Sequence, residues 1–193
     1  TPVKGPQNKL LNHATLINSF GKIVATYNKL HLFDVFLDGE SPTGESKRYE
    51  PGTKAVLVET PFGPIGMTIC YDIRFPQLYR DLAKAGALLC FVPSAFTIPT
   101  GKAHWEVLLR ARAIENGMWI IAAAQVGSHE DGRETWGHSM VISPWGEVIL
   151  ELSGEKSEIK TVEIDLTEVA STRRQIPSLQ SDSFYELSKI PLV

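Results

Sequence analysis

Cys70 stands where a chain can present a nucleophile. It ends the apolar run 65–69, and the residues from 75 onward have the apolar spacing of a helix, so Cys70 lies on a strand-to-helix turn. Such a turn points its side chain out of the sheet edge and aims the first helical N–H groups at the same spot. A thiolate there is favoured by the helix dipole and by a nearby cation, and the N–H groups can hold a tetrahedral oxyanion. The context alone leaves open a second interpretation, a buried and unreactive cysteine.

Two charged residues follow Cys70 and argue against a dry site. We expect Asp72 and Arg74 to form a structural ion pair that fixes the turn. The other cysteine, Cys90, lies within the continuous apolar run 87–92, and we expect it to be a small buried core residue. Two cysteines do not make the disulfide framework of a small secreted protein, so both thiols are expected to be reduced.

The remaining reactive side chains predict no metal and no cofactor. His104, Trp105 and Glu106 are consecutive on an expected helix, so their side chains diverge and cannot share one ion. Zinc-ligand spacing is also missing for the histidines His13, His129 and His138. No glycine-rich phosphate loop is present, which predicts no nucleotide cofactor.

The elements that must position Cys70 are predicted by apolar alternation and by turn residues. In chain order they are strands at 14–17, 22–27, 55–60 and 65–69, a helix at 75–85 stopped by Gly86, a strand at 87–92, a helix at 102–116 stopped by Gly117, and a strand at 118–124. The strand–helix–strand succession implies parallel pairing with a right-handed crossover. The polar stretch 38–54 is expected to be a long loop.

The rest of the chain predicts a hairpin, one more strand and a peripheral end. Residues 139–142 and 148–150 are expected to form the hairpin, and 159–164 alternate with period two as a strand does. Thr167 is expected to cap a last short helix, and 177–193 to form an irregular, peripheral tail. Strands outnumber helices, which is typical of an α/β sandwich of two sheets covered by helices.

Bulk properties exclude several function classes. The 193 residues suffice for one domain, 1–193, with a real core. A composition of 43% hydrophobic and 21% charged residues with a net charge of −3 shows no basic stripe, so we predict no nucleic-acid partner. No apolar run approaches the roughly 20 residues of a membrane span, and from the polar first residues we expect no secretory signal. We expect no membrane association and a cytoplasmic location, with a mitochondrial one also compatible.

Two motifs closely resemble those of the nitrilase superfamily of carbon–nitrogen hydrolases. They are Lys29-Leu30-His31-Leu32-Phe33-Asp34 and Cys70-Tyr71-Asp72-Ile73-Arg74-Phe75-Pro76, in the family's order and spacing. The resemblance runs through nearly the whole chain, as far as Pro177. It implies the family's four-layer α-β-β-α sandwich, here lacking its N-terminal strand or strands and helix.

The resemblance also implies site residues. Cys70 is then the nucleophile that forms a thioester acyl-enzyme, and Lys29 steadies the oxyanion and donates a proton to departing ammonia. The Tyr71 N–H is the second oxyanion donor. Glu45 matches the family's supporting glutamate, which bonds Lys29 or positions substrate; its alternative is an ordinary solvated loop acid. His31 is expected to be a structural hydrogen-bonding residue.

One family residue has no counterpart in the chain. The glutamate that acts as general base comes from a strand before the region that matches the start of this sequence, and we assign it to no residue here. The expectation is that the intact protein is longer, or that its N-terminal segment is a separate partner chain.

A third stretch resembles one branch of the family, the Nit amidases that act on deaminated glutathione. The matching segments are 94–106, 109–115 and 136–138. The implied substrate is a small, peptide-like α-keto acid whose side-chain amide is hydrolysed to acid and ammonia. Ser94, Phe96 and Thr97 follow a buried strand and are expected to line the pocket mouth, or else to pack only their own loop.

Several alternatives stay open. Within the family they are an ω-amidase for short keto-acid amides, a carbamoylase and a true nitrilase. A non-catalytic binding subunit is the alternative suggested by the missing glutamate. A Ser–His–Asp hydrolase using Ser94 and His138 is the last, and it predicts full activity without Cys70. Family members usually pair as homodimers, so we expect a homodimer or a higher homo-oligomer.

Overall fold

The structure is a computed structural model that describes residues 1–35, 43–130 and 132–191. Its centre is a six-stranded sheet in the order β13-β12-β9-β8-β7-β6. These strands are β6 (Val56–Val58), β7 (Ile65–Met67), β8 (Leu89–Phe91), β9 (Trp119–Ala122), β12 (Met140–Ile142) and β13 (Val148–Glu151). β7, β8 and β9 pair in parallel, and the other neighbours pair antiparallel. The predicted strand–helix–strand pairing is confirmed.

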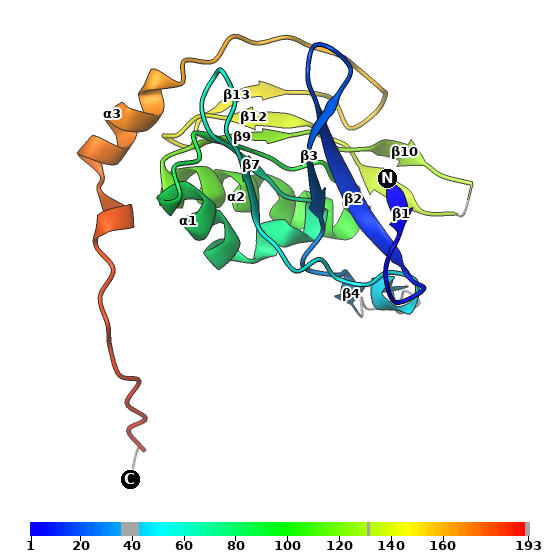
Figure 1. The fold of residues 1–193 in the computed structure, drawn as a ribbon, viewed down its shortest axis with the longest axis horizontal. Helices are drawn as coiled ribbons and strands as arrows, with labels where there is room; N and C mark the ends of the chain where they lie inside the picture. Colours follow the sequence, from blue (N-terminus) through cyan, green and yellow to red (C-terminus); the bar gives the residue numbers. More distant parts are fainter. Residues whose placement is uncertain (36–42, 131, 192–193) are drawn as a thin grey trace.

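Two helices cover one face of this sheet. α1 (Pro76–Lys84) connects β7 to β8, α2 (Ile98–Asn116) connects β8 to β9, and both lie along the same side of the sheet in Figure 1. Their buried side chains, such as Leu82 and Leu109, pack with Cys90 and Ile120 in the largest core cluster. Cys90 is therefore the buried core residue that its apolar surroundings predict.

A second, three-stranded sheet packs on the opposite face. β1 (Pro2–Lys4), β2 (Leu10–Ile17) and β3 (Ile23–Asn28) pair antiparallel in that order. Side chains alternate along β7, so Gly66 faces Leu82 of α1 while Met67 packs with Tyr27 of β3. The described residues thus form three layers, helices on a sheet on a sheet. This α/β architecture positions the end of β3 over the end of β7.

The helix boundaries follow local chemistry. α1 ends before Gly86, whose φ is +110°, and α2 ends at Gly117, whose φ is +51°. Both stops were predicted. α2 begins at Ile98 rather than at 102 as expected. Pro99 falls in its first turn, where the missing N–H has no intrahelical acceptor to lose.

The expected strand at 159–164 is wrong as a paired strand. Among the described residues it has no ladder partner, and the chain there is irregular. Its alternation still sets which side chains face inward: Val162 and Ile164 pack against the cluster around Trp119, whereas Ile159 is 96% exposed. Alternation of apolar residues predicts which side chains face the core. It does not show whether a second strand is present to pair with the backbone N–H and C=O groups.

One further expectation is corrected, and another holds only in part. Thr167 is the first residue of α3 (Thr167–Gln175) rather than its cap, since the Asp165 carboxylate accepts both its N–H (2.8 Å) and its hydroxyl (2.7 Å). In the expected loop 38–54, residues 38–42 lie outside the described residues. The remainder holds short elements: β5 (Thr43–Gly44), paired with β4 (Asp34–Val35), and the 3-10 helix η1 (Glu45–Lys47).

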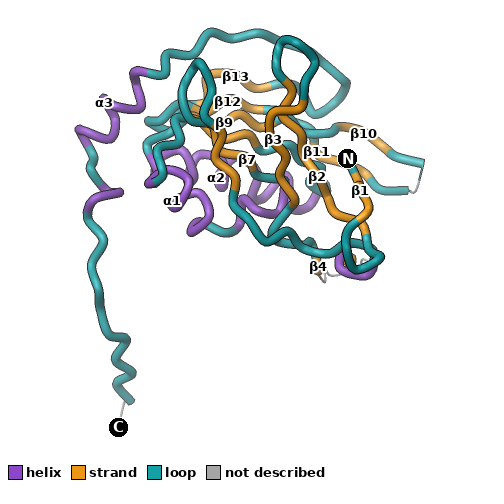
Figure 2. The backbone as a smooth tube through the Cα atoms, viewed as in Figure 1, coloured by secondary structure: helices purple, strands orange, loops and turns teal. Residues whose placement is uncertain are grey.

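Two elements lie outside the central layers. A hairpin that the sequence analysis did not predict, β10 (Val126–Ser128) with β11 (Glu134–Trp136), precedes β12. After α3 and the 3-10 helix η3 (Ser178–Gln180), residues 181–191 form a C-terminal arm without regular structure that runs away from the body (Figure 2). Of the helices described, none has the length and apolar character needed to cross a bilayer.

Candidate active site

A buried carboxylate ties the lysine segment to the cysteine turn. Asp72 Oδ1 accepts the His31 N–H (3.0 Å) and lies 2.8 Å from His31 Nδ1. Asp72 Oδ2 accepts the Tyr27 hydroxyl (2.7 Å) and the Ile69 N–H (2.9 Å). Burial, and next the neighbouring Asp72 charge, raise the pKa of Tyr27, so the phenol remains a donor. Lys29 lies between Tyr27 and His31, so its backbone is held in a fixed relation to the turn at Cys70.

The expected Asp72–Arg74 ion pair is absent from the described residues. Arg74 turns the other way, with Nη2 3.2 Å from His104 Nδ1 and its guanidinium carbon 5.7 Å from the Tyr71 ring centroid. The two residues lie two positions apart on η2 (Cys70–Arg74), a 3-10 helix with about three residues per turn, so their side chains diverge. Asp72 does fix the turn as expected, but through the lysine segment rather than through Arg74.

Lys29 and Glu45 form a buried ion pair beside Cys70. The Lys29 side chain is 3% exposed, and Nζ donates to Glu45 Oε2 over 2.5 Å. Glu45 also accepts the Phe33 N–H (2.6 Å) on Oε2 and the Asn12 side-chain amide (3.0 Å) on Oε1. With three donors and 12% exposure, Glu45 is not a solvated loop acid. Its carboxylate is committed to holding the lysine.

Cys70 has a strained backbone conformation shortly after the carboxyl end of β7. Its φ is +51°, in the left-handed region that a residue with a Cβ enters at a cost of roughly 1–2 kcal/mol. Strain of this kind gathers at functional sites. The Cys70 N–H donates to Pro93 O (2.9 Å), which ties the turn to the segment after the parallel neighbour β8. Tyr71 is the next residue. The first hydrogen bond of η2 starts one residue later, where the Asp72 N–H donates to Ile69 O (3.1 Å).

The surroundings of Cys70 raise the pKa of its thiol. Burial raises its pKa, and the Glu45 charge adds to the rise; the Lys29 ammonium, the Ala95 N–H and the Ser94 hydroxyl oppose it. The net direction is upward, which corrects the expectation of a favoured thiolate. Lys29 has its charge balanced by Glu45, and a five-residue 3-10 helix supplies only a weak dipole. The thiol therefore needs a base before it can act as a nucleophile.

The predicted pocket residues separate in space. Ser94 is buried, faces the Cys70 sulfur and donates from Oγ to Val92 O (3.1 Å). Phe96 instead points into the core, where its ring centroid lies 4.8 Å from that of Trp105. Thr97 precedes α2, with Oγ1 2.9 Å from Thr100 Oγ1. Of the three, Ser94 is the one that meets the cysteine.

The alternative Ser–His pairing has no support in the geometry. His138 Nδ1 lies 2.6 Å from Glu151 Oε1, and its ring stacks on Trp136 rather than meeting Ser94. Within the described residues, no three His, Cys, Asp or Glu side chains gather in a way that could hold a metal ion. Two cavities, of about 290 and 150 Å³, lie away from Cys70 and Lys29.

Sequence reasoning missed three groups that build the site: Asn12, Tyr27 and the Ala95 N–H. Tyr27 carried a usable signal, because it lies two residues before Lys29 on the inward face of a predicted strand. Asn12 and Ala95 carried none, since their roles depend on how separate segments meet.

Comparison with known proteins gives consistent matches over most of the chain. The model of the carbon–nitrogen hydrolase family matches residues 2–174. The deaminated glutathione amidase of a Synechocystis strain is 48% identical over 95% of this chain and 68% of its own length. The human deaminated glutathione amidase is also 48% identical, over 89% of this chain and 53% of its own. The chain therefore spans between about half and two thirds of the length of these relatives.

Solved structures share the fold. The NitFhit protein of C. elegans superposes with a TM-score of 0.82 at 43% identity, covering 93% of this chain and 44% of that one. A mutant of an amidase from a Nesterenkonia species, with acrylamide added at its active-site cysteine, superposes with a TM-score of 0.67 at 29% identity. That match covers 80% of this chain and 58% of the amidase.

Removing the Asp72 charge should destabilise the protein more than removing a matched surface charge. In Asp72→Asn, the side-chain amide places N–H groups against donors that a carboxylate oxygen accepts in the unaltered protein. We therefore expect the free energy of unfolding to fall by about 3 kcal/mol. Asp81→Asn is the control, because Asp81 is exposed on α1 and accepts from Gln77 on the same helix (2.8 Å). Urea unfolding followed by circular dichroism measures both. Equal losses would mean that Asp72 does not hold the two segments together.

The two cysteines should differ in alkylation. Cys90 is fully buried and burial raises its pKa to about 12, so iodoacetamide should modify Cys70 much faster at every pH. Because the pKa of Cys70 is also raised, its rate should keep climbing beyond the ordinary thiol pKa of about 8.5. Lys29→Met should move the climb to higher pH by removing the cation that opposes the rise. Peptide mass spectrometry gives the rates, and a plateau below pH 8 would contradict the electrostatic account.

Proposed function

This chain belongs to the carbon–nitrogen hydrolase family, and from that premise we propose that it carries the nucleophile and the oxyanion site of an amidase. The observation that supports this most directly is the buried Lys29–Glu45 pair, held beside the strained turn of Cys70 through Asp72. A lysine that is buried, paired and fixed by its backbone is suited to meet one developing charge in one place.

The proposed reaction has two stages. The Cys70 sulfur adds to the amide carbonyl carbon while its proton passes to a base. The resulting oxyanion lies against the Lys29 ammonium and the Tyr71 N–H. The carbon–nitrogen bond then breaks, the nitrogen takes up the proton and leaves, and a thioester remains on Cys70. Water hydrolyses the thioester, which releases the acid and restores the thiol. Glu45 acts as a positioning residue that keeps Lys29 in place.

We assign the base to a carboxylate outside residues 1–193. Glu45 is already committed to Lys29, Asn12 and the Phe33 N–H, and the raised pKa of Cys70 requires a proton acceptor. The base would lie on an N-terminal segment of the same protein or of a separate chain, and that segment would complete the four-layer sandwich. The run 159–164, which has inward Val162 and Ile164 and no ladder partner among the described residues, offers a strand from such a segment a place to pair.

The proposed substrate is a peptide-like α-keto acid such as deaminated glutathione. Relatives that are 44–48% identical carry that activity in their names. Both amides of this compound are secondary, so hydrolysis yields an acid and an amine rather than the ammonia expected above; α-ketoglutaramate, a primary amide, would release ammonia. Ser94, beside the cysteine, and Thr97, at the start of α2, are the proposed pocket-mouth residues.

The test is hydrolysis of both amides by the intact protein and its cysteine variants. We expect acid release from deaminated glutathione to fall by several orders of magnitude in Cys70→Ala, because members of a catalytic unit act together. Cys90→Ala should retain the activity. Liquid chromatography with mass spectrometry identifies the products. Preference for α-ketoglutaramate would point to an ω-amidase. No hydrolysis of any amide by the folded, intact protein would instead support a binding subunit.

We also propose that the protein self-associates through its C-terminal arm. Four large apolar side chains there are 82–108% exposed: Phe184, Tyr185, Leu187 and Ile190. Large apolar side chains this exposed, on a segment that leaves the body (Figure 1), are typical of an interaction site, and the proposed occupant is a second copy of the protein.

Light scattering during size-exclusion chromatography measures the self-association. The unaltered protein should have the mass of a dimer or of a larger oligomer, and Phe184→Ser with Leu187→Ser should shift it toward the monomer. Ser183→Ala with Ser188→Ala, on the same arm, is the control and should leave the mass unchanged. A monomeric mass for the unaltered protein would exclude the homodimer.

A further inference from the structure

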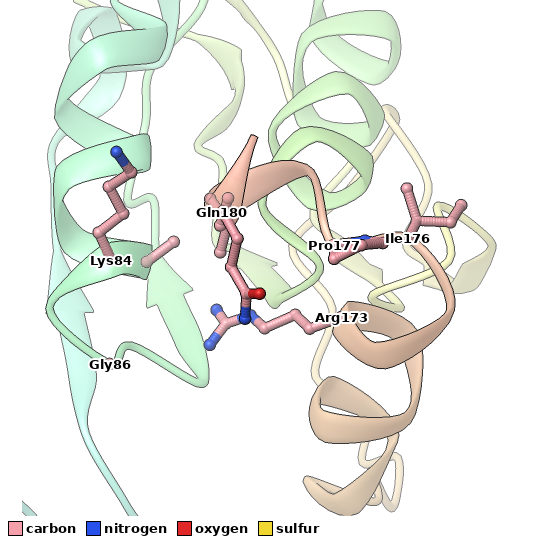
Figure 3. A pocket seen from close by; sticks show the side chains of 8 residues that line it. Lys84, Gly86, Arg173, Ile176, Pro177 and Gln180 are labelled. Carbon is pink, nitrogen blue, oxygen red and sulfur yellow. The ribbon is translucent and has the colours of Figure 1, made fainter. Parts of the chain in front are cut away.

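A cavity of about 290 Å³ lies between α1 and the elements that follow α3. Its lining includes Lys84 and Gly86 at the end of α1, Arg173 on α3, and Pro177 and Gln180 near η3 (Figure 3). None of these residues belongs to the candidate active site. The cavity is therefore a separate feature, and its chemistry has to be explained by its own side chains.

Arg173 brings a cation without a counter-ion into this cavity. Its Nε donates to Asn116 O (3.0 Å) and its Nη2 to Ala87 O (2.7 Å). In the part of the chain that the structure describes, no carboxylate pairs with it, and burial lowers the pKa of Arg173. A guanidinium has five N–H donors, so donors remain beyond these two carbonyls. Figure 3 shows the guanidinium reaching toward Gln180 and the turn at Gly86.

One cation of the lining, Lys84, already pairs with a carboxylate. Arg80 and Lys84, one turn apart on α1, both pair with Asp182 of the C-terminal arm. Arg80 also donates to Ser178 O (2.9 Å). Two cations, Lys84 and Arg173, thus line the cavity, and Asp182 balances Lys84 together with Arg80, one turn away on α1. The pairing of Lys84 with Asp182 shows that this end of α1 can hold an oxyanion, whereas Arg173 has only carbonyl partners among the described residues.

We propose that this cavity binds a small oxyanion, a phosphate or a short carboxylate, between Arg173 and the Lys84 end of α1. Its volume is near the lower limit of about 300 Å³ for small-molecule sites, which suits a group of this size and not a nucleotide. The planar fork of an arginine favours oxygen pairs of such groups. A bound anion would compete with Asp182 for Lys84, so its binding is linked to the docking of the arm.

Calorimetric titration of the intact protein tests the proposal with inorganic phosphate and, separately, with succinate at constant ionic strength. We expect saturable binding of at least one of them at one site per chain. Arg173→Gln should weaken it at least tenfold, since a charge-assisted hydrogen bond is lost. Arg174→Gln, the exposed neighbour on α3, is the matched control and should leave affinity unchanged. Asp182→Asn should strengthen binding severalfold, because the competing carboxylate is removed.

The comparison of the two titrants separates the sources of the oxyanion. Tighter binding of phosphate assigns the site to a phosphate group, and tighter binding of succinate assigns it to a carboxylate. Arg173→Gln also loses two backbone contacts, so Lys84→Gln on the more exposed rim provides a second variant whose fold is less at risk. Absence of saturable binding overturns the proposal. Equal affinity in Lys84→Gln and Arg174→Gln overturns it as well.

Discussion

The buried Asp72 carboxylate is the interaction on which the rest of the site depends. A charge removed from water is costly unless it is paired and hydrogen-bonded, and here every acceptor position is directed to one of two segments. Separating the Tyr27–His31 segment from the Ile69 turn would strand that charge in the core. The position of Lys29 relative to Cys70 is therefore enforced by the same free energy that opposes unfolding.

The electrostatic state of the site follows from this arrangement. Lys29 and Glu45 neutralise each other at 2.5 Å, so the lysine does not by itself draw the proton from Cys70. Its role is directed at charge that appears later, on a substrate oxygen. A neutral thiol beside an ion pair of zero net charge costs the resting protein less free energy than a buried thiolate would. A base is then needed only when substrate is bound and the sulfur attacks.

Local chemistry predicted most of the fold, and contacts between distant segments account for what it missed. Gly86 and Gly117 marked the helix ends because a left-handed stop needs no partner elsewhere in the chain. Asp72 and Arg74 are close in sequence, which suggested an ion pair, but the direction of each side chain depends on the turn. Asp72 takes most of its hydrogen bonds from Tyr27 on β3 and from His31 just after it. The run 159–164 alternates as a strand does, but no neighbouring strand pairs with it among the described residues. Phe96 follows the strand β8 as expected, but its side chain points into the core.

The backbone conformation at Cys70 serves the chemistry of the site but lowers the stability of the fold. Its φ of +51° suits glycine, and to a lesser degree asparagine, better than any residue with an ordinary side chain. On stability alone, position 70 therefore favours a residue without sulfur. Random substitution under selection for thermal resistance alone would be expected to drift toward such residues and to erase the nucleophile while improving the scaffold. The cysteine can persist only while its reactivity is itself under selection.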